Sequence, residues 1–290
     1  MYETTIRQFE KLGYACLPTL VSSEEIDAMC LEMEAMVSGA PLGPQSSNDR
    51  DGNPVPFPTD FSYHDHNNAP LLIRISNQLR RSALMRIVYA NPSLLLLVEA
   101  LFGPKFVPFA ESIIVKLPGI GAPIPFHQDG KQHYDIRYRG LNLGIYLQPS
   151  TTKNGCLWAI PRSHLRGLVD VSALRGEHGP LLPDSLPVEI DRGGVTVHDR
   201  SLIHGSLTNT SSDLRITVYF GFHKLSSVES IHDRETIRRR AQIVSLCIAE
   251  RQKSKFRDET PYDYALRDFA PPPASESERN EVLGQGAIAI

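Results

Sequence analysis

The sequence predicts a mainly β protein with flanking helices, in which an antiparallel sandwich or small barrel forms the core. Three stretches alternate apolar and polar residues with a period of two, which is typical of strands with one apolar and one polar face. These stretches are residues 112–117, 141–148 and 214–220. Shorter strand candidates, at residues 155–160 and 194–198, are separated by Gly, Pro, Asn and Ser turns. Short strands with no helical pattern between them favour such a core, which we expect over residues 105–225.

Helices are expected before and after the β core. The first forty residues predict a helix, a loop and a second helix, which begins at a capping box in residues 22–25 and carries one apolar stripe. Asn91 and Pro92 form a cap and first-turn pair. Further helical segments are expected at residues 79–89, 94–101 and 234–249. The stretch from Pro271 onward is expected to be extended or poorly ordered.

Residues 41–70 differ in composition from the helices around them. They are dense in Pro, Gly, Asn and Asp, with Phe57, Phe61 and Tyr63 scattered among them. A stretch of this length without periodicity is typical of a functional lid or a disordered insertion, and the aromatic residues favour a lid. We expect one domain over residues 1–290. Its parts are a helical N-terminal part (1–104) with the lid, the β core (105–225), and a C-terminal helix and tail (226–290).

Composition and charge restrict the classes of partner. The 290 residues include 30 Lys and Arg against 33 Asp and Glu, for a formal net charge of −3, which gives no basic surface for nucleic acid or an anionic membrane. No apolar run reaches the roughly 18 residues that a membrane helix needs, and the N-terminal stretch lacks the apolar segment of a signal peptide. The four cysteines form no CxxC motif, which favours reduced thiols. We expect a cytoplasmic protein with a small-molecule partner, without nucleic acid or membrane, whose oligomeric state stays open, a homodimer included.

Four residues form the chemically informative pattern. His127 and Asp129 are two residues apart on an expected strand, so their side chains point to the same side and can reach one metal ion after a bend. His204 follows much later in the chain, and Arg215 begins an expected strand. Two histidines and one carboxylate form the facial triad that holds Fe(II) with open positions, while an arginine inside a barrel can bind a carboxylate bidentately. Together these residues predict a non-haem iron site.

In the order and spacing of these motifs, the sequence resembles the phytanoyl-CoA dioxygenase-like (PhyH-like) family of Fe(II)/2-oxoglutarate-dependent oxygenases. The resemblance covers most of the chain. It is carried by residues 9–14, 17–18, 125–129, 153–157, 160–164 and 204–215. It implies a double-stranded β-helix, the jelly-roll core of cupin-like proteins. It also implies that His127, Asp129 and His204 hold the iron.

The resemblance further implies where the cosubstrate and the substrate bind. Arg215 with Ser206 would hold the distal carboxylate of 2-oxoglutarate, and Lys116 can reach the cofactor in such a family or can be a solvated lysine at a strand end. Asn142 stands near the place where phytanoyl-CoA hydroxylases proper have a tryptophan, so a lipid-CoA substrate is not supported, although this strand still suggests a cofactor wall. The candidate substrate contacts are Phe57, Phe61, Tyr63, His64, His66 and His133. His164 and His198 are expected to be structural.

The activity implied by the resemblance is coupled oxidation. 2-Oxoglutarate and O₂ would give succinate and CO₂ while a C–H bond of a small organic, biosynthetic substrate is hydroxylated or similarly oxidised, with ascorbate as the reductant in vitro. Two alternatives remain open at this point. A cupin-like metal enzyme without an oxoacid cosubstrate, such as an isomerase, would not need Arg215 in its pocket. A metal-silent small-molecule binding module would tolerate His204→Ala.

Overall fold

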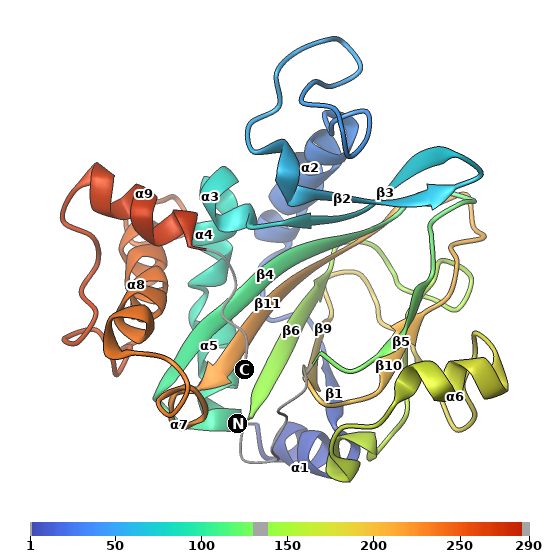
Figure 1. Ribbon diagram of the computed structural model, residues 1–290. Helices are drawn as coiled ribbons and strands as arrows, with labels where there is room; N and C mark the ends of the chain where they lie inside the picture. The colour runs from blue at the N-terminus through green and yellow to red at the C-terminus, as the bar shows by residue number, and fades with distance from the viewer. Residues whose placement is uncertain (1, 130–138, 286–290) are drawn as a thin grey trace.

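Two antiparallel sheets face each other in the computed structural model, which describes residues 2–129 and 139–285 (Figure 1). Among these residues the larger sheet has seven strands. Its spatial order is β1 (Tyr14–Leu17), β9 (Val195–Asp199), β6 (Gly140–Tyr146), β11 (Arg215–Lys224), β4 (Phe106–Lys116), β3 (Ala69–Ser76) and β2 (Phe61–His66). The smaller sheet runs β5 (Ile124–His127), β10 (His204–Ser206), β7 (Leu157–Ala159) and β8 (Leu186–Val188). The predicted fold class, mainly β with a jelly-roll core, is confirmed, and the two sheets do not close into a barrel.

Helices cover the outer face of the larger sheet, on the side away from β5 and β10 (Figure 1). Those that pack on β4 and β11 are α5 (Pro92–Phe102) and α8 (Arg234–Arg251), with α4 (Ala83–Tyr89) against α8. The other helices are α1 (Glu3–Leu12), α2 (Ser23–Ser38), α3 (Gln78–Arg81), α6 (Val171–His178), α7 (Leu225–Val228) and α9 (Glu276–Gly284), with 3₁₀ turns at Pro58–Asp60 and Ser163–Arg166. The predicted capping box is present at the start of α2, where Ser22 and Glu25 bond each other's backbone amides. These helices bury the apolar faces of the strands.

Strand alternation makes the two faces of the larger sheet chemically different. Ile113, Val115, Ile216 and Val218 point outward and are buried in the main apolar core against the helices. Residues opposite one another in an antiparallel pair share a face. One inner-face row therefore runs through Arg74, Ile114, Thr217 and Tyr146, and the next contains Ser112, Tyr219, Gly144 and Thr196. The inner face thus carries polar side chains toward the smaller sheet.

The segment expected as an irregular lid is in part a β-hairpin. β2 and β3 pair over residues 61–76, and β3 continues the larger sheet through Ile75 opposite Ile113. The turn contains Asn67 and Asn68, both with positive φ (54° and 64°), as a two-residue type I′ hairpin turn requires. Asparagine tolerates this left-handed region, so this part of the chain can form a strand pair despite its loop-like composition. That residues 41–70 act as a lid stays a prediction.

Three other elements differ from the sequence-based expectation. β1 occupies part of the stretch expected as a loop, because it pairs with β9 (Ala15 opposite Val197). α6 lies within the expected β core and packs near β5. The tail contains α9, which Ser275 caps through the Glu278 amide and which packs against α8. Each is a short element stabilised by contacts distant in the sequence, which local patterning does not reveal.

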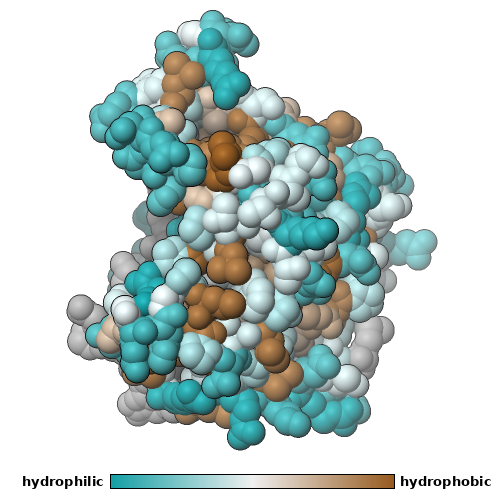
Figure 2. All heavy atoms as spheres, turned by 90° about the vertical axis from the view of Figure 1, so that its right-hand side faces the viewer, coloured by the Kyte–Doolittle hydropathy of each residue, from teal (hydrophilic) through white to brown (hydrophobic). Residues whose placement is uncertain are grey.

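No single helix in residues 2–129 and 139–285 is long and apolar enough to span a membrane; α4 and α5 reach that length and apolarity only as a pair, bent by 49°. Figure 2 shows the end of the molecule that lies at the right of Figure 1. On this face the apolar side chains form several separate patches among polar ones.

Candidate active site

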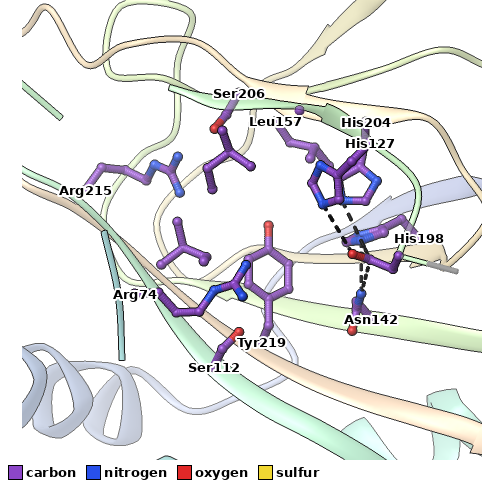
Figure 3. Close-up of a pocket in the computed structure, with 14 residues that line it drawn as sticks. Arg74, Ser112, His127, Asn142, Leu157, His198, His204, Ser206, Arg215 and Tyr219 are labelled. Atoms are coloured by element: carbon purple, nitrogen blue, oxygen red, sulfur yellow. Dashed lines mark hydrogen bonds and ion pairs between the residues drawn. The ribbon is translucent and has the colours of Figure 1, made fainter. Parts of the chain in front are cut away.

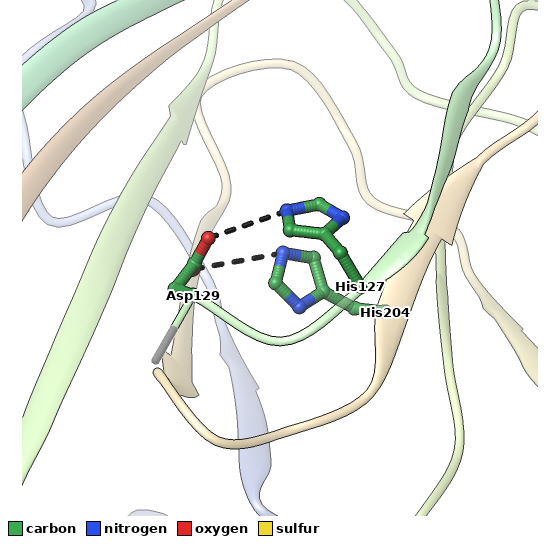
Figure 4. Close-up of side chains that lie close together, drawn as sticks. All are labelled: His127, Asp129 and His204. Carbon is green, nitrogen blue, oxygen red and sulfur yellow. Dashed lines mark ion pairs between the residues drawn. The ribbon is translucent and has the colours of Figure 1, made fainter. Parts of the chain in front are cut away.

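Strand pairing brings the two predicted histidine ligands together. His127 at the end of β5 lies directly opposite His204 at the start of β10. Asp129 follows β5, and its amide donates to the Arg200 carbonyl (2.7 Å), which fixes the turn. Asp129 Oδ1 is 3.2 Å from His127 Nε2, and Oδ2 is 3.7 Å from His204 Nε2 (Figure 4). One candidate ligand atom from each residue lies within 4.8 Å of the others, so the donor set fits one iron ion.

Each histidine is oriented by its own backbone. His127 Nδ1 lies 2.8 Å from the Pro125 carbonyl, and His204 Nδ1 lies 2.9 Å from the Leu202 carbonyl. Because a carbonyl only accepts, both rings carry their proton on Nδ1. The Nε2 lone pairs therefore face Asp129 and are available to a metal ion.

Asp129 has two further neighbours on the larger sheet. Asn142 on β6 donates through Nδ2 to Asp129 Oδ2 at 2.7 Å. His198 on β9 lies beside it, with Nε2 3.7 Å from the same oxygen and 3.4 Å from Asn142 Nδ2 (Figure 3). Asn142 thus lines the cavity as a polar group and bonds the Asp129 carboxylate; its predicted role toward the cofactor stays a prediction. His198, expected to be structural, lines the site as well.

Electrostatics favour an ionised carboxylate. Burial alone would raise the pKa of Asp129, but the neighbouring histidines, His204 first among them, hold it well below its usual range. Burial and the neighbouring His127 lower the pKa of His204 to about 3. A neutral imidazole and an ionised carboxylate are the forms that bind a metal ion. His204 and Asp129 are therefore in the protonation states that bind a cation.

A cavity that opens to solvent contains this cluster and the predicted anion-binding pair. Arg215 at the start of β11 is 2% exposed. It donates to Thr217 Oγ1 (2.7 Å) and to the Gly155 carbonyl, while its Nε has no partner among the described residues. Ser206 on β10 lines the same cavity, and its buried Oγ has no such partner either. These free donors suit a carboxylate.

Lys116 takes a different place from the one the resemblance implied. It lies opposite Arg215 on β4 and is completely buried. Its Nζ donates to the carbonyls of Ala122 (2.5 Å) and Leu207 (2.8 Å), and it is not among the residues that line the cavity. The described structure therefore does not bring Lys116 to the cofactor.

The aromatic residues of the expected lid also lie outside the cavity. Phe61 packs in the main core, and Tyr63 packs against that core with its hydroxyl on the Pro41 carbonyl (2.5 Å). Phe57 lies under the guanidinium of Arg80, whose carbon is 4.0 Å from the ring centroid. As candidate substrate contacts these three were placed wrongly, because strand parity and the arginine direct them away from the inner face. His64 and His66 are exposed near the hairpin turn and do not line the cavity, and His133 lies outside the described residues.

Besides His198, three polar or charged residues that line the cavity were not predicted as site residues, namely Arg74, Ser112 and Tyr219. Ser112 and Tyr219 share the inner face with Arg215, so the period-two pattern could have identified them. Gly144 makes room for the Tyr219 ring, since a Cβ there would lie 2.7 Å from Tyr219 Cε1. Arg74 lies on β3, and only the pairing of β3 with β4 reveals that it faces the cavity.

The comparison with known families agrees with this geometry. The family model described as "Phytanoyl-CoA dioxygenase (PhyH)" matches residues 9–217. The chain belongs to this family. Its members include a "Phytanoyl-CoA dioxygenase" of Arabidopsis thaliana, 38% identical over 111 residues that cover 35% of this chain and 39% of that protein. The match thus spans about two fifths of that relative's length. A "Probable alpha-ketoglutarate-dependent hypophosphite dioxygenase" of Stutzerimonas stutzeri is 24% identical over 240 residues, 77% of this chain and 78% of that protein.

Solved structures support the fold assignment. AviO1 from Streptomyces viridochromogenes Tue57 has a TM-score of 0.61 and 25% identity, covering 77% of this chain and 94% of that chain. EctD from S. alaskensis, solved with 2-oxoglutarate and 5-hydroxyectoine, has a TM-score of 0.60 and 19% identity, covering 78% and 77%. The two-sheet core of this chain is therefore the fold of these proteins.

Proposed function

We propose that this chain is an Fe(II)/2-oxoglutarate-dependent oxygenase in which His127, Asp129 and His204 hold the iron. The observation that carries the proposal is the convergence of two Nε2 atoms and one carboxylate within 4.8 Å, with both rings oriented by backbone carbonyls. Family membership supports it, as does the name of the hypophosphite dioxygenase relative. With O₂, bound iron would couple oxidation of 2-oxoglutarate to succinate and CO₂ with hydroxylation, or related oxidation, of a substrate C–H bond.

In this proposal Arg215 and Ser206 bind the distal carboxylate of 2-oxoglutarate. Both lie in the same cavity as the triad, and each has a donor without a partner among the described residues. The buried guanidinium supplies charge where water is excluded, so a carboxylate gains more there than at the surface. The bond from Asn142 keeps the Asp129 carboxylate in one orientation.

The substrate is proposed to be a small molecule that fits beside the cosubstrate in the cavity. Two relatives are named for small phosphorus compounds, the hypophosphite dioxygenase above and a "Methylphosphonate hydroxylase" of Gimesia maris. Hypophosphite and methylphosphonate therefore belong in a substrate panel, together with biosynthetic intermediates. The deciding experiment measures succinate release from the purified chain with Fe(II), ascorbate, O₂ and 2-oxoglutarate, with and without each candidate.

Succinate release that increases when one candidate is added supports the oxygenase function. Metal binding without 2-oxoglutarate binding would favour a cupin-like enzyme that uses no oxoacid, such as an isomerase. A chain that binds neither would be a binding module.

We also infer a cytoplasmic location and one domain over residues 1–290, with no nucleic-acid or membrane partner. The four cysteines are free, which suits a reducing compartment. The net charge of −3 provides no positive electrostatic field that would attract polyanions such as nucleic acid. Fractionation and the elution volume of the purified chain test the location and whether it is a monomer or a homodimer.

A further inference from the structure

The cavity contains a second arginine whose charge has no partner in the described parts of the chain. Arg74 on β3 lines the cavity with Arg215, yet no hydrogen bond or ion pair joins it to any residue within 2–129 or 139–285. Figure 3 shows its side chain extending from β3 toward the cavity. Arg215, in contrast, already donates to Thr217 and Gly155. Arg215 is thus bonded to the protein through its terminal nitrogens, whereas the guanidinium of Arg74 is available to a ligand.

The fold holds Arg74 at this place. It lies opposite Ile114 on β4, in the inner-face row that continues to Thr217 on β11. The strand that carries it leads into Asn77 and Arg80, which both bond the buried Asp60 carboxylate, so the hairpin is tied down close to Arg74. Arg74 is solvent-exposed and at the same time lines the cavity, with no acidic side chain bonded to it among the described residues.

Counted over the described residues, the charges of the loaded site leave Arg74 without compensation. Fe(II) and Arg215 together balance the Asp129 carboxylate and the two carboxylates of 2-oxoglutarate. The metal-bound histidines are neutral. With cosubstrate in place, the guanidinium of Arg74 therefore adds a positive charge that the described residues of the site do not balance, and the concave cavity focuses its field on an entering anion.

We propose that Arg74 binds an oxyanion of the substrate, so that the enzyme acts on small organic anions. The inference rests on the proposed function. A planar guanidinium presents paired N–H donors that match a carboxylate or a phosphonate equally well, so the shared chemistry is a terminal oxyanion. Ser112 and Tyr219, also on the inner face, provide neutral polar surface next to it. Arg74 is thus a specificity residue on the substrate side, and Arg215 serves the cosubstrate.

The test uses the full chain loaded anaerobically with Fe(II) and 2-oxoglutarate, titrated by calorimetry with benzoate, phenylphosphonate and the uncharged benzamide. We expect wild type to bind at least one anion about 10-fold or more tightly than benzamide. Arg74→Gln should lose this preference, Arg74→Lys should keep part of it, and Arg166→Gln, a matched change at an exposed arginine outside the cavity, should leave it unchanged. The relative strength of benzoate and phenylphosphonate distinguishes carboxylates from phosphonates.

Three results would overturn the inference. The first is that Arg74→Gln retains the full anion preference. The second is that the preference vanishes in Arg215→Gln and persists in Arg74→Gln, which would place the anion at the cosubstrate position. The third is that Arg74→Gln weakens 2-oxoglutarate binding as much as Arg215→Gln does. If wild type binds no 2-oxoglutarate, the proposed function fails. The same titration of the chain with Fe(II) alone then still decides whether Arg74 selects anions.

Discussion

His127 and His204 lie opposite each other on β5 and β10 with ring centroids 4.4 Å apart, and each bonds the carbonyl two residues before it. The same bond between a ring Nδ1 and a backbone carbonyl on two strands gives both rings the same tautomer. Both Nε2 atoms therefore face Asp129 without help from any other side chain. The metal site is built mainly from backbone geometry, which the strand pairing determines.

His204→Ala should abolish stoichiometric iron binding, because a two-ligand remnant loses both a donor and the facial geometry. Iron content measured by plasma emission should fall from one equivalent per chain to near zero. His178→Ala, at the partly exposed C-terminal end of α6, is the matched control and should retain one equivalent. One equivalent of iron in His204→Ala would remove this residue from the ligand set.

Arg215→Gln should weaken 2-oxoglutarate binding by at least about 10-fold, since a charge-assisted hydrogen bond contributes about 1.5–3 kcal/mol. Titration of the iron-loaded protein measures this, and the iron content should stay at the wild-type value. Arg166→Gln, at an exposed position, should bind 2-oxoglutarate as wild type does. Thermal unfolding of both variants checks that the buried substitution leaves the chain folded. An unchanged affinity would separate Arg215 from the cosubstrate.

The sequence alone could predict the parts of the site that follow local rules. Period-two alternation located β4, β6 and β11, and the sequence pattern picked out His127, Asp129 and His204, whose candidate ligand atoms lie within 4.8 Å of one another. These signals are readable because an apolar outer face must alternate with a polar inner face wherever helices cover one side of a sheet.

What could not be predicted depends on pairing across the chain. Arg74 faces the cavity only because β3 joins the edge of β4, and a turn through Asn67 and Asn68 makes that hairpin. His198 reaches Asp129 because β9 pairs with β6, where His198 lies opposite Asn142. The aromatic residue Phe61 points into the main core because its position in β2 has outward parity. Composition, on which the lid interpretation rests, does not show which face of a strand a residue occupies.

Asn142→Ala should weaken iron binding by about 10–100-fold, because outer-shell partners of metal-bound carboxylates orient them and tune their basicity. Competition with a metal chelator at fixed pH measures the change. Asn280→Ala, at an exposed position of α9, is the control. If Asn142 contacts the cosubstrate instead, the variant would keep its iron affinity and lose 2-oxoglutarate affinity, which would contradict the bond to Asp129 as its main role.

Asp60→Asn should destabilise the chain by about 3 kcal/mol, because Asp60 is buried and compensates both Arg80 and Arg81, which would lose their counter-charge. Urea denaturation measures the change, with Asp65→Asn at the exposed hairpin tip as the control. Hydrogen exchange over residues 57–66 should become faster in Asp60→Asn.

The lid prediction for residues 41–70 has its own test. In wild type, slower hydrogen exchange over residues 41–70 on adding substrate would support the lid prediction, and equal rates with and without substrate would make this stretch a plain surface loop.

Lys116→Met should remove a pH dependence of folding stability. Burial, reinforced by Arg215, lowers the pKa of Lys116 to about 6, whereas the unfolded chain holds its lysines near the ordinary value. Between these two pH values the unfolded state binds one more proton at this site than the folded state does. The free energy of unfolding therefore rises with pH across this interval, by up to about 1.4 kcal/mol per pH unit.

Urea denaturation of wild type and Lys116→Met at several pH values from about 6.5 to 8.5 isolates this contribution. This range of about two pH units lies between the folded and unfolded pKa values of the lysine. Wild type should gain stability relative to the variant as the pH rises, while Lys11→Met on the exposed side of α1 should follow wild type. Because Nζ donates to Ala122 and Leu207 and lies outside the cavity lining, 2-oxoglutarate affinity in Lys116→Met should stay within about 3-fold of wild type, less than one charge-assisted hydrogen bond is worth. A 10-fold loss of that affinity, with no change in the pH slope, would instead place the lysine on the cosubstrate.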